Sequence, residues 1–117
     1  MARIFILLAA AWLGVATPAF AQPRVQFPTR VTAAILARLC EREIAPCLGY
    51  VIGVADSYAS ALAGSGRPQL FCIPQGATNE EIRQVAVRFV NAHPEEAAAN
   101  ASIVVLAALR AAYPCTR

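Results

Sequence analysis

The sequence predicts an all-α fold, a compact bundle of about four helices stapled by two disulfides, with a C-terminal antiparallel helical hairpin. Three observations lead to this fold class. Apolar residues recur at helical spacing in separate stretches, Pro and Gly mark the boundaries between them, and all four cysteines follow an export signal. A chain of 117 residues has room for one small domain.

Residues 1–21 match the pattern of a cleaved signal peptide. Arg3 supplies the positive charge, residues 4–15 form the apolar stretch, and Ala19-Phe20-Ala21 is a small-x-small cleavage site. The apolar stretch is shorter than the roughly 20 residues that a membrane span needs. The pattern therefore predicts export to the periplasm, with no membrane attachment once the signal is cleaved.

Cleavage after Ala21 predicts a mature chain in two parts, an extended lead-in at residues 22–28 and a helical domain at residues 29–117. The lead-in contains Pro23 and Pro28, which disfavour a helix. All four cysteines lie after the signal, and an even number of cysteines in a small exported domain predicts disulfides. A zinc site is disfavoured because the chain has no CxxC pair.

The charge pattern and the motifs exclude most other classes of protein. The ten basic residues are all Arg, and removal of Arg3 leaves nine Arg against seven acidic residues, a mature charge of +2. That charge is too small and too scattered for a nucleic-acid-binding surface. The chain has one His and no P-loop, GxGxxG or HExxH motif. We therefore expect no enzyme activity, no cofactor, no bound metal and no nucleic-acid partner.

The first two helices are predicted on either side of Pro46, which marks the turn between them. Thr29 or Thr32 caps the first helix, whose apolar residues recur at helical spacing as far as residues 40–42. The second helix is expected from about residue 47 to residue 63, because its apolar residues form a stripe along one face.

Three residues stand out within the second helix. Gly49 and Gly53 lie four residues apart, a spacing of small residues that lets another backbone approach closely. We interpret this pair as a packing device. Asp56 is the one carboxylate in an apolar stretch, and we favour a position facing water over a buried position with a partner.

The clearest loop follows the second helix, where residues 64–69 contain two Gly and one Pro. A short apolar run at residues 70–73 comes next and is closed by Pro74. The run is too short for a helix, so we expect an extended segment that Phe71 and Cys72 hold against the core.

The third helix has the strongest start signal in the chain. Thr78 is its N-cap, and Glu81 stands three residues later and completes a capping box. His93 is interpreted as a cap at a tight turn, and Pro94 is expected to open the fourth helix at its first position. Residues 101–109 are apolar nearly all round, which predicts a central, buried helix.

The hairpin geometry predicts the disulfide pairing. Cys72 precedes the third helix and Cys115 follows the fourth, so an antiparallel pair of helices brings them to the same end. We expect the fourth helix to be longer by about five residues, or roughly 7.5 Å, which residues 72–78 can span. Cys40 and Cys47 then form the second pair. In the chain-entropy model these bridges contribute at most about 4 and about 2.5 kcal/mol.

Five short motifs occur in order over nearly the whole mature domain, roughly Cys40 to Cys115. They are Cys47-Leu-Gly49-Tyr50-Val-Ile-Gly53-Val-Ala-Asp56, Cys72-Ile73-Pro74, Thr78-x-x-Glu81-Ile82, His93-Pro94-Glu95 and Ala112-Tyr113-Pro114-Cys115. Together, behind a signal peptide, this set resembles the Tai family of immunity proteins, the periplasmic antidotes of type VI secretion amidase effectors. Glu81 departs from the family pattern, where Gln is expected, but either residue completes a capping box.

The resemblance implies a small, helical, disulfide-stabilised protein that is often a homodimer. It implies a partner, a Cys/His peptidoglycan amidase that a neighbouring cell injects, and inhibition by a protruding loop that covers the catalytic groove. Such an inhibitor needs no catalytic residue. It needs a rigid scaffold, a projecting loop and a few anchoring side chains.

The connector at residues 64–70 is the candidate loop by composition, although an ordinary interhelical connector is the alternative. Arginine makes a suitable anchor because its planar guanidinium offers five donors. Tyrosines are frequent at interfaces, and the alternative for them is a half-buried place in the core. The candidate partner-binding residues are Arg67, Gln69, Ser65, Tyr50 and Tyr58.

Two other functions are compatible with this sequence. A small periplasmic stress chaperone would open at low pH, but seven carboxylates are few for an acid switch. An orphan helical binding module would keep the scaffold without its ancestral toxin partner.

Overall fold

The computed structural model describes residues 30–116, and within that range it contains four α-helices, one 3-10 turn and no β-strand. The predicted fold class, a bundle of about four helices with two disulfides, is confirmed. The elements are α1 (Ala33–Arg42), α2 (Ile44–Leu62), α3 (Asn79–Ala92), η1 (Pro94–Glu96) and α4 (Ala101–Ala112).

Several predictions fall on residues outside the described range. The signal peptide at residues 1–21, the lead-in at residues 22–28 and the cap at Thr29 all lie there. No helix within residues 30–116 has the length and apolar character needed to cross a membrane.

α1 and α2 are separated by a single extended residue. α1 has Thr32 as its N-cap, whose hydroxyl accepts a hydrogen bond from the Ile35 N–H at 3.3 Å. Glu43 alone breaks the helix, with φ −141° and ψ 110°. The prediction that Pro46 marks the turn is wrong, because Pro46 is the third residue of α2. The missing N–H of proline is harmless there, since the first four N–H groups of a helix have no intrahelical partner.

α4 begins later than the sequence predicts. Pro94 opens the short turn η1 instead of the fourth helix, and α4 starts after Asn100, whose side chain caps it. The start of α4 is set by pairing with the start of α1. The Ala101 N–H donates to the Val31 carbonyl at 3.0 Å, and the Ala33 N–H donates to the Ala99 carbonyl at 2.9 Å. This tertiary pairing satisfies donors that a helix continuous from Pro94 would have bonded internally.

Both predicted disulfides are confirmed, although one premise of the prediction is wrong. α4 has 12 residues and α3 has 14, so the fourth helix is the shorter one. Cys72 still reaches Cys115 because the end of α4 lies beside the start of α3, where Glu81 and Ala112 line the same surface pocket. The Cys40–Cys47 bridge joins α1 to α2 across the break at Glu43.

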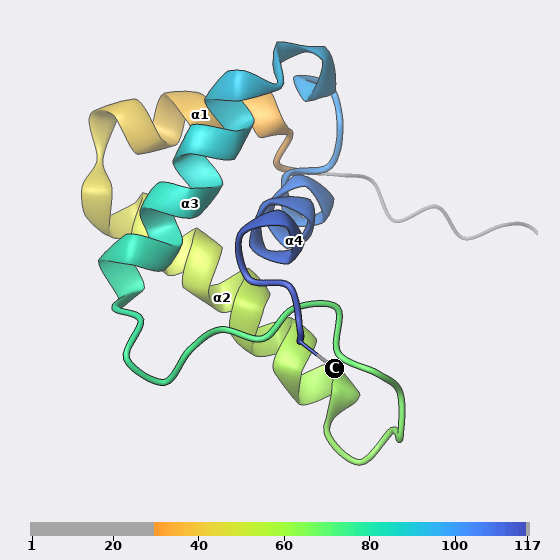
Figure 1. The fold of residues 1–117 in the computed structure, drawn as a ribbon. Helices are drawn as coiled ribbons and strands as arrows, with labels where there is room; N and C mark the ends of the chain where they lie inside the picture. Colours follow the sequence, from red (N-terminus) through yellow and green to blue (C-terminus); the bar gives the residue numbers. More distant parts are fainter. Residues whose placement is uncertain (1–29, 117) are drawn as a thin grey trace, which may run out of the picture.

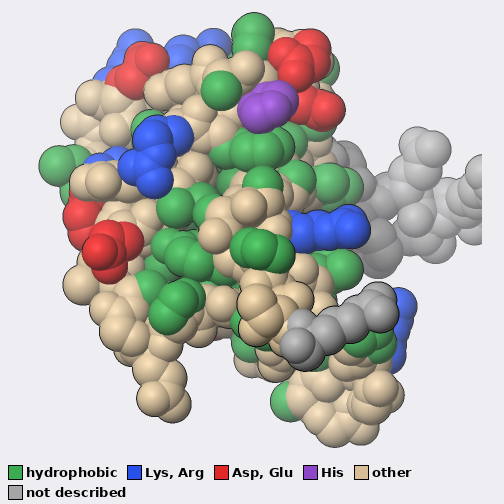
Figure 2. Space-filling view, in the orientation of Figure 1, with side chains coloured by type: hydrophobic (Ala, Val, Ile, Leu, Met, Phe, Trp, Pro, Cys, Tyr) green, Lys and Arg blue, Asp and Glu red, His purple; other side chains and the backbone are tan. Residues whose placement is uncertain are grey.

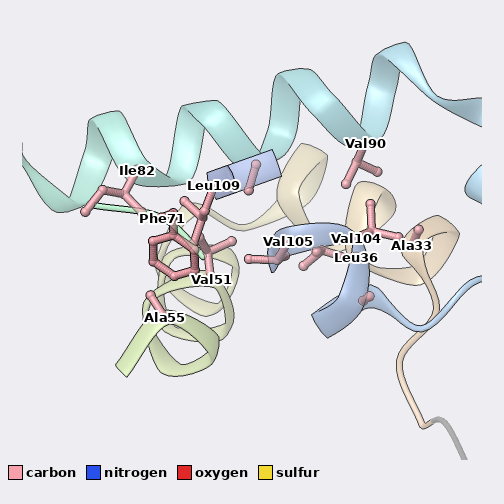
Figure 3. Packing of buried hydrophobic residues seen from close by; sticks show 12 residues of the cluster. Ala33, Leu36, Val51, Ala55, Phe71, Ile82, Val90, Val104, Val105 and Leu109 are labelled. Carbon is pink, nitrogen blue, oxygen red and sulfur yellow. The ribbon is translucent and has the colours of Figure 1, made fainter. Parts of the chain in front are cut away.

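α4 supplies more buried residues than any other described helix, but it is not buried all round as its apolar sequence predicts, because Ile103 is 64% exposed. It contacts α1, α2 and α3, which lie to its left and below it in Figure 1. Its buried side chains include Val104, Val105 and Leu109, which meet Leu36 of α1 and other residues of the core (Figure 3). Phe71, from the connector between α2 and α3, adds an aromatic ring to this core and is only 7% exposed.

The two glycines of α2 do not admit a neighbouring backbone, which corrects the packing interpretation. Gly49 and Gly53 are both exposed, and a Cβ atom placed on either would meet nothing within 4 Å. Asp56, one turn further along α2, is exposed to solvent as we favoured.

Candidate partner-binding site

The connector after α2 projects from the bundle as a defined loop. We call residues 63–70 the 63–70 loop; it is the light green segment beyond the C-terminal end of α2 in Figure 1. Gly64 and Gly66 have positive φ angles, +73° and +66°, which residues with a Cβ rarely adopt. These two glycines let the chain reverse direction immediately after the helix.

Ser65 holds the first half of the loop. Its hydroxyl donates to the Leu62 carbonyl at 2.8 Å and accepts from the Arg67 N–H at 3.2 Å. The Ser65 N–H also donates to the Leu62 carbonyl, at 2.9 Å. The Ser65 hydroxyl therefore shapes the loop and holds the backbone of Arg67.

Tyr58 holds the second half of the loop. Its hydroxyl accepts a hydrogen bond from the Leu70 N–H at 2.9 Å, and its ring lies 5.0 Å from the ring of buried Phe71. One residue further on, the Cys72 N–H donates to the Tyr113 carbonyl at 2.8 Å. The chain is thus tied to α2 and to the end of α4 directly after Leu70.

Gln69 lies against the disulfide at the base of the loop. Its Oε1 atom is 3.6 Å from Cys72 Sγ, and its carbonyl oxygen is 3.9 Å from Cys115 Sγ. Both sulfurs are oxidised and carry no proton, so these are van der Waals contacts and not hydrogen bonds. Gln69 also lines a small groove of about 190 Å³ with Asp56, Leu62 and Ile73.

The loop presents two side chains of different character to solvent. The Arg67 side chain is exposed and has no hydrogen-bond or ion-pair partner within residues 30–116. Leu70 is 46% exposed, a large apolar side chain beside the polar residues of the loop. A guanidinium group and an apolar side chain on a fixed backbone, such as those of Arg67 and Leu70, can together anchor a protein partner.

Leu70 is the residue that sequence reasoning missed. The sequence predicts an apolar run pinned to the core, but only Phe71 is buried and Leu70 points outward. The signal was the extended conformation itself, because successive side chains of an extended segment face opposite sides.

Tyr50 does not lie with the other candidate residues. It is eight residues before Tyr58 on α2, or about 12 Å along the helix. It lines a separate groove of about 590 Å³ between α2 and α4, which Tyr58 also borders. Partial burial raises the pKa of the Tyr50 hydroxyl above its usual value.

The predicted caps surround α3 and take no part in the loop. Thr78 and Glu81 form a reciprocal capping box, in which the Glu81 N–H donates to Thr78 Oγ1 at 3.2 Å and the Thr78 N–H donates to Glu81 Oε2 at 2.7 Å. The hydrogen bonds from Thr78 lower the pKa of the Glu81 carboxyl.

His93 closes the other end of α3. Its Nδ1 atom lies 2.8 Å from the Phe89 carbonyl oxygen, and its ring stacks on the Phe89 ring at 3.9 Å. Figure 2 shows this histidine, the purple side chain, at the end of an apolar seam on the surface. Within residues 30–116 no group of three or more His, Cys, Asp or Glu side chains is placed to hold a metal ion.

Comparison with known proteins identifies a family. The family of Rap1a immunity proteins matches residues 32–115, a span that contains all four helices, both disulfides and the 63–70 loop. No curated protein and no solved structure matches the chain.

Proposed function

Because this chain belongs to the Rap1a immunity protein family, whose members are type VI secretion immunity proteins, we propose that it is an exported antidote to a peptidoglycan amidase effector. The family implies binding of a secreted effector as the activity of the chain. The choice of an amidase rests on the resemblance to the Tai family. The periplasmic location rests on the signal-peptide pattern at residues 1–21.

The observation that carries the proposal is the anchoring of the 63–70 loop at both ends. Ser65 fixes its start on α2, and the Tyr58 hydroxyl fixes its end at Leu70. A loop that is already ordered loses less conformational entropy when it binds than a mobile loop does. The proposed mechanism is steric: the loop enters the catalytic groove of the effector and excludes the peptidoglycan substrate.

In this mechanism Arg67 and Leu70 are the anchoring side chains. The Arg67 guanidinium pairs with a carboxylate or with carbonyl oxygens at the rim of the effector groove, where its planar fork can make two parallel hydrogen bonds. Leu70 packs against an apolar part of the same groove. Inhibition of this kind requires no chemistry, so we propose a non-enzymatic inhibitor.

The test is a binding and inhibition assay with the exported chain and a Cys/His peptidoglycan amidase effector of type VI secretion. We expect a nanomolar dissociation constant in titration calorimetry and loss of peptidoglycan cleavage at one equivalent. Arg67→Glu should weaken binding by at least about tenfold, as loss of an interface anchor does. Arg38→Glu makes the same charge change at an exposed position of α1 and should leave binding unchanged.

The outcomes separate the parts of the proposal. Tight binding that Arg67→Glu and Leu70→Asp both leave intact would show an immunity protein that uses another surface. Absence of binding to the amidase would remove the amidase as the target. The resemblance also implies a homodimer, and sedimentation equilibrium of the free chain tests that separately.

A further inference from the structure

The α2–α4 groove is an apolar depression on the described part of the chain that lies outside the 63–70 loop. We use this name for the groove of about 590 Å³ lined by Gly49, Tyr50, Gly53, Val54, Ser57, Tyr58, Ser102 and Leu106. None of these side chains is charged. The backbone of α2 is uncovered in this groove at Gly49 and Gly53, which have no Cβ atom. A Cβ atom placed on either glycine would have no other atom within 4 Å.

The chain enters the fold next to this groove. Arg30 is the first described residue, and the Val31 carbonyl accepts a hydrogen bond from the Ala101 N–H at 3.0 Å. Thr32 pairs with Asn100 in an isolated bridge. The next residue of α4 after Ala101 is Ser102, which lines the groove. The segment that precedes Arg30 therefore starts within one or two residues of the groove wall.

The segment before Arg30 is long enough to cover the groove. Residues 22–29 number eight and span up to about 26 Å when extended. The α2 wall runs from Gly49 to Tyr58, nine residues further along, or about 13.5 Å. The segment can follow the whole groove with residues to spare.

The composition of the segment suits an apolar groove with a bare floor. Pro23 and Pro28 favour an extended backbone. Val25 and Phe27 are two residues apart, so they face the same side of an extended chain, while Gln26 faces the opposite side. An aromatic ring can lie directly on helix backbone only where Cβ atoms are absent, as at Gly49 and Gly53.

We propose that residues 22–29 bind along the α2–α4 groove of their own chain, with Phe27 over the Gly49–Gly53 backbone and Val25 further along the groove. The segment then acts as a strap that removes this apolar surface from solvent. It also ties the N-terminus to α2, the helix that carries Tyr58 and the 63–70 loop. The proposal does not depend on the effector, but it rests on the export of the proposed function, because cleavage of the signal peptide makes residue 22 the N-terminus.

The test uses the exported chain, with its N-terminus established by mass spectrometry, and two readouts. The first is nuclear Overhauser contact between the Phe27 ring and the methyl groups of Val54 or Leu106. The second is the rate of tryptic cleavage after Arg24. We expect the contacts to be present, and cleavage to be at least about tenfold slower than in a free peptide of residues 22–31.

Gly53→Leu tests the groove directly. The substitution fills the floor at an exposed helical position with open space, so the fold should be retained, and circular dichroism verifies this. We expect the Phe27 contacts to disappear and cleavage after Arg24 to approach the rate of the peptide. Ala107→Leu adds the same side chain on an exposed part of α4 outside the groove and should change neither readout.

Three results would overturn the proposal. They are cleavage of the unaltered chain at the rate of the peptide, absence of Phe27 contacts with groove residues, and contacts that appear only between differently labelled chains. The last result would assign the groove to a second copy of the chain.

Discussion

The hydroxyl of Tyr58 accepts a hydrogen bond from the backbone N–H of Leu70 at 2.9 Å, across twelve residues of sequence. The same tyrosine ring lies 5.0 Å from the ring of Phe71. A single side chain of α2 therefore fixes both the backbone and the core contact at the point where the 63–70 loop returns to the bundle. The end of the loop is therefore held in a fixed position by contacts with α2 and the core.

Tyr58→Phe should loosen the end of the loop while keeping the ring in place. Removal of the hydroxyl leaves the Leu70 N–H without its partner, and we expect the free energy of unfolding to fall by about 0.5–1.5 kcal/mol. Amide hydrogen exchange at Leu70 should become several-fold faster. Tyr50→Phe removes a hydroxyl from the same helix outside the loop, so equal exchange at Leu70 in both variants would contradict this role.

Removal of the Cys72–Cys115 disulfide should affect the loop more than removal of Cys40–Cys47. Both double Ala variants lose a crosslink, and the chain-entropy model gives upper costs of about 4 kcal/mol for the longer loop and about 2.5 kcal/mol for the shorter. Only the Cys72–Cys115 bridge lies against Gln69. We expect faster hydrogen exchange in residues 67–70 for that variant alone, measured by mass spectrometry.

Leu70→Ala and Phe71→Ala should separate binding from stability. Phe71 is 7% exposed in the core, so its truncation should cost about 3–5 kcal/mol in chemical denaturation. Leu70 is 46% exposed, so its truncation should change stability by less than about 0.5 kcal/mol. If the loop enters the effector groove, Leu70→Ala should nevertheless weaken binding. A Leu70→Ala variant with unchanged affinity would remove this residue from the interface.

The sequence was sufficient for the number of helices because the signals for a helix are local, and the order of the helices then indicated the disulfides. Thr78 and Glu81 are three residues apart, and the capping box that they predict sets the start of α3. The Cys72–Cys115 pairing required only that α3 and α4 pack as antiparallel neighbours, because the start of α3 then lies beside the end of α4. The sequence also placed Phe71 in the core, because a short apolar run next to a disulfide cysteine is held close to the core.

The errors arose where tertiary contacts decide the local structure. Pro94 and the two glutamates after it favour a helix start, yet α4 begins at Ala101 because its first N–H bonds to Val31 of the chain before α1. Gly49 and Gly53 predict a close helix contact, but no described backbone approaches them. The alternation of an extended segment allows Leu70 to face outward, but the contact that selects this direction comes from Tyr58, twelve residues away.

The start of α3 should give the protein a stability that declines in strong acid. Hydrogen bonds from Arg83, and then from Gln84, lower the pKa of the Glu80 carboxyl to about 2. The Arg83 Nε–H lies 2.7 Å from Glu80 Oε2. The hydrogen bonds from Thr78 lower the pKa of the Glu81 carboxyl as well. In the unfolded chain a glutamate titrates near pH 4.3.

The direction of the effect follows from these shifts. Because the folded pKa of Glu80 is depressed, its contribution to stability is fully present above about pH 4.3 and is lost as the pH falls toward 2. We expect Glu80→Gln to flatten the dependence of Tm on pH between about 4.3 and 2. Equal slopes in Glu80→Gln and the unaltered chain would contradict the prediction. Since the contribution of Glu80 is lost only below about pH 4.3, this carboxylate does not open the fold in mild acid, as a periplasmic acid-stress chaperone would require.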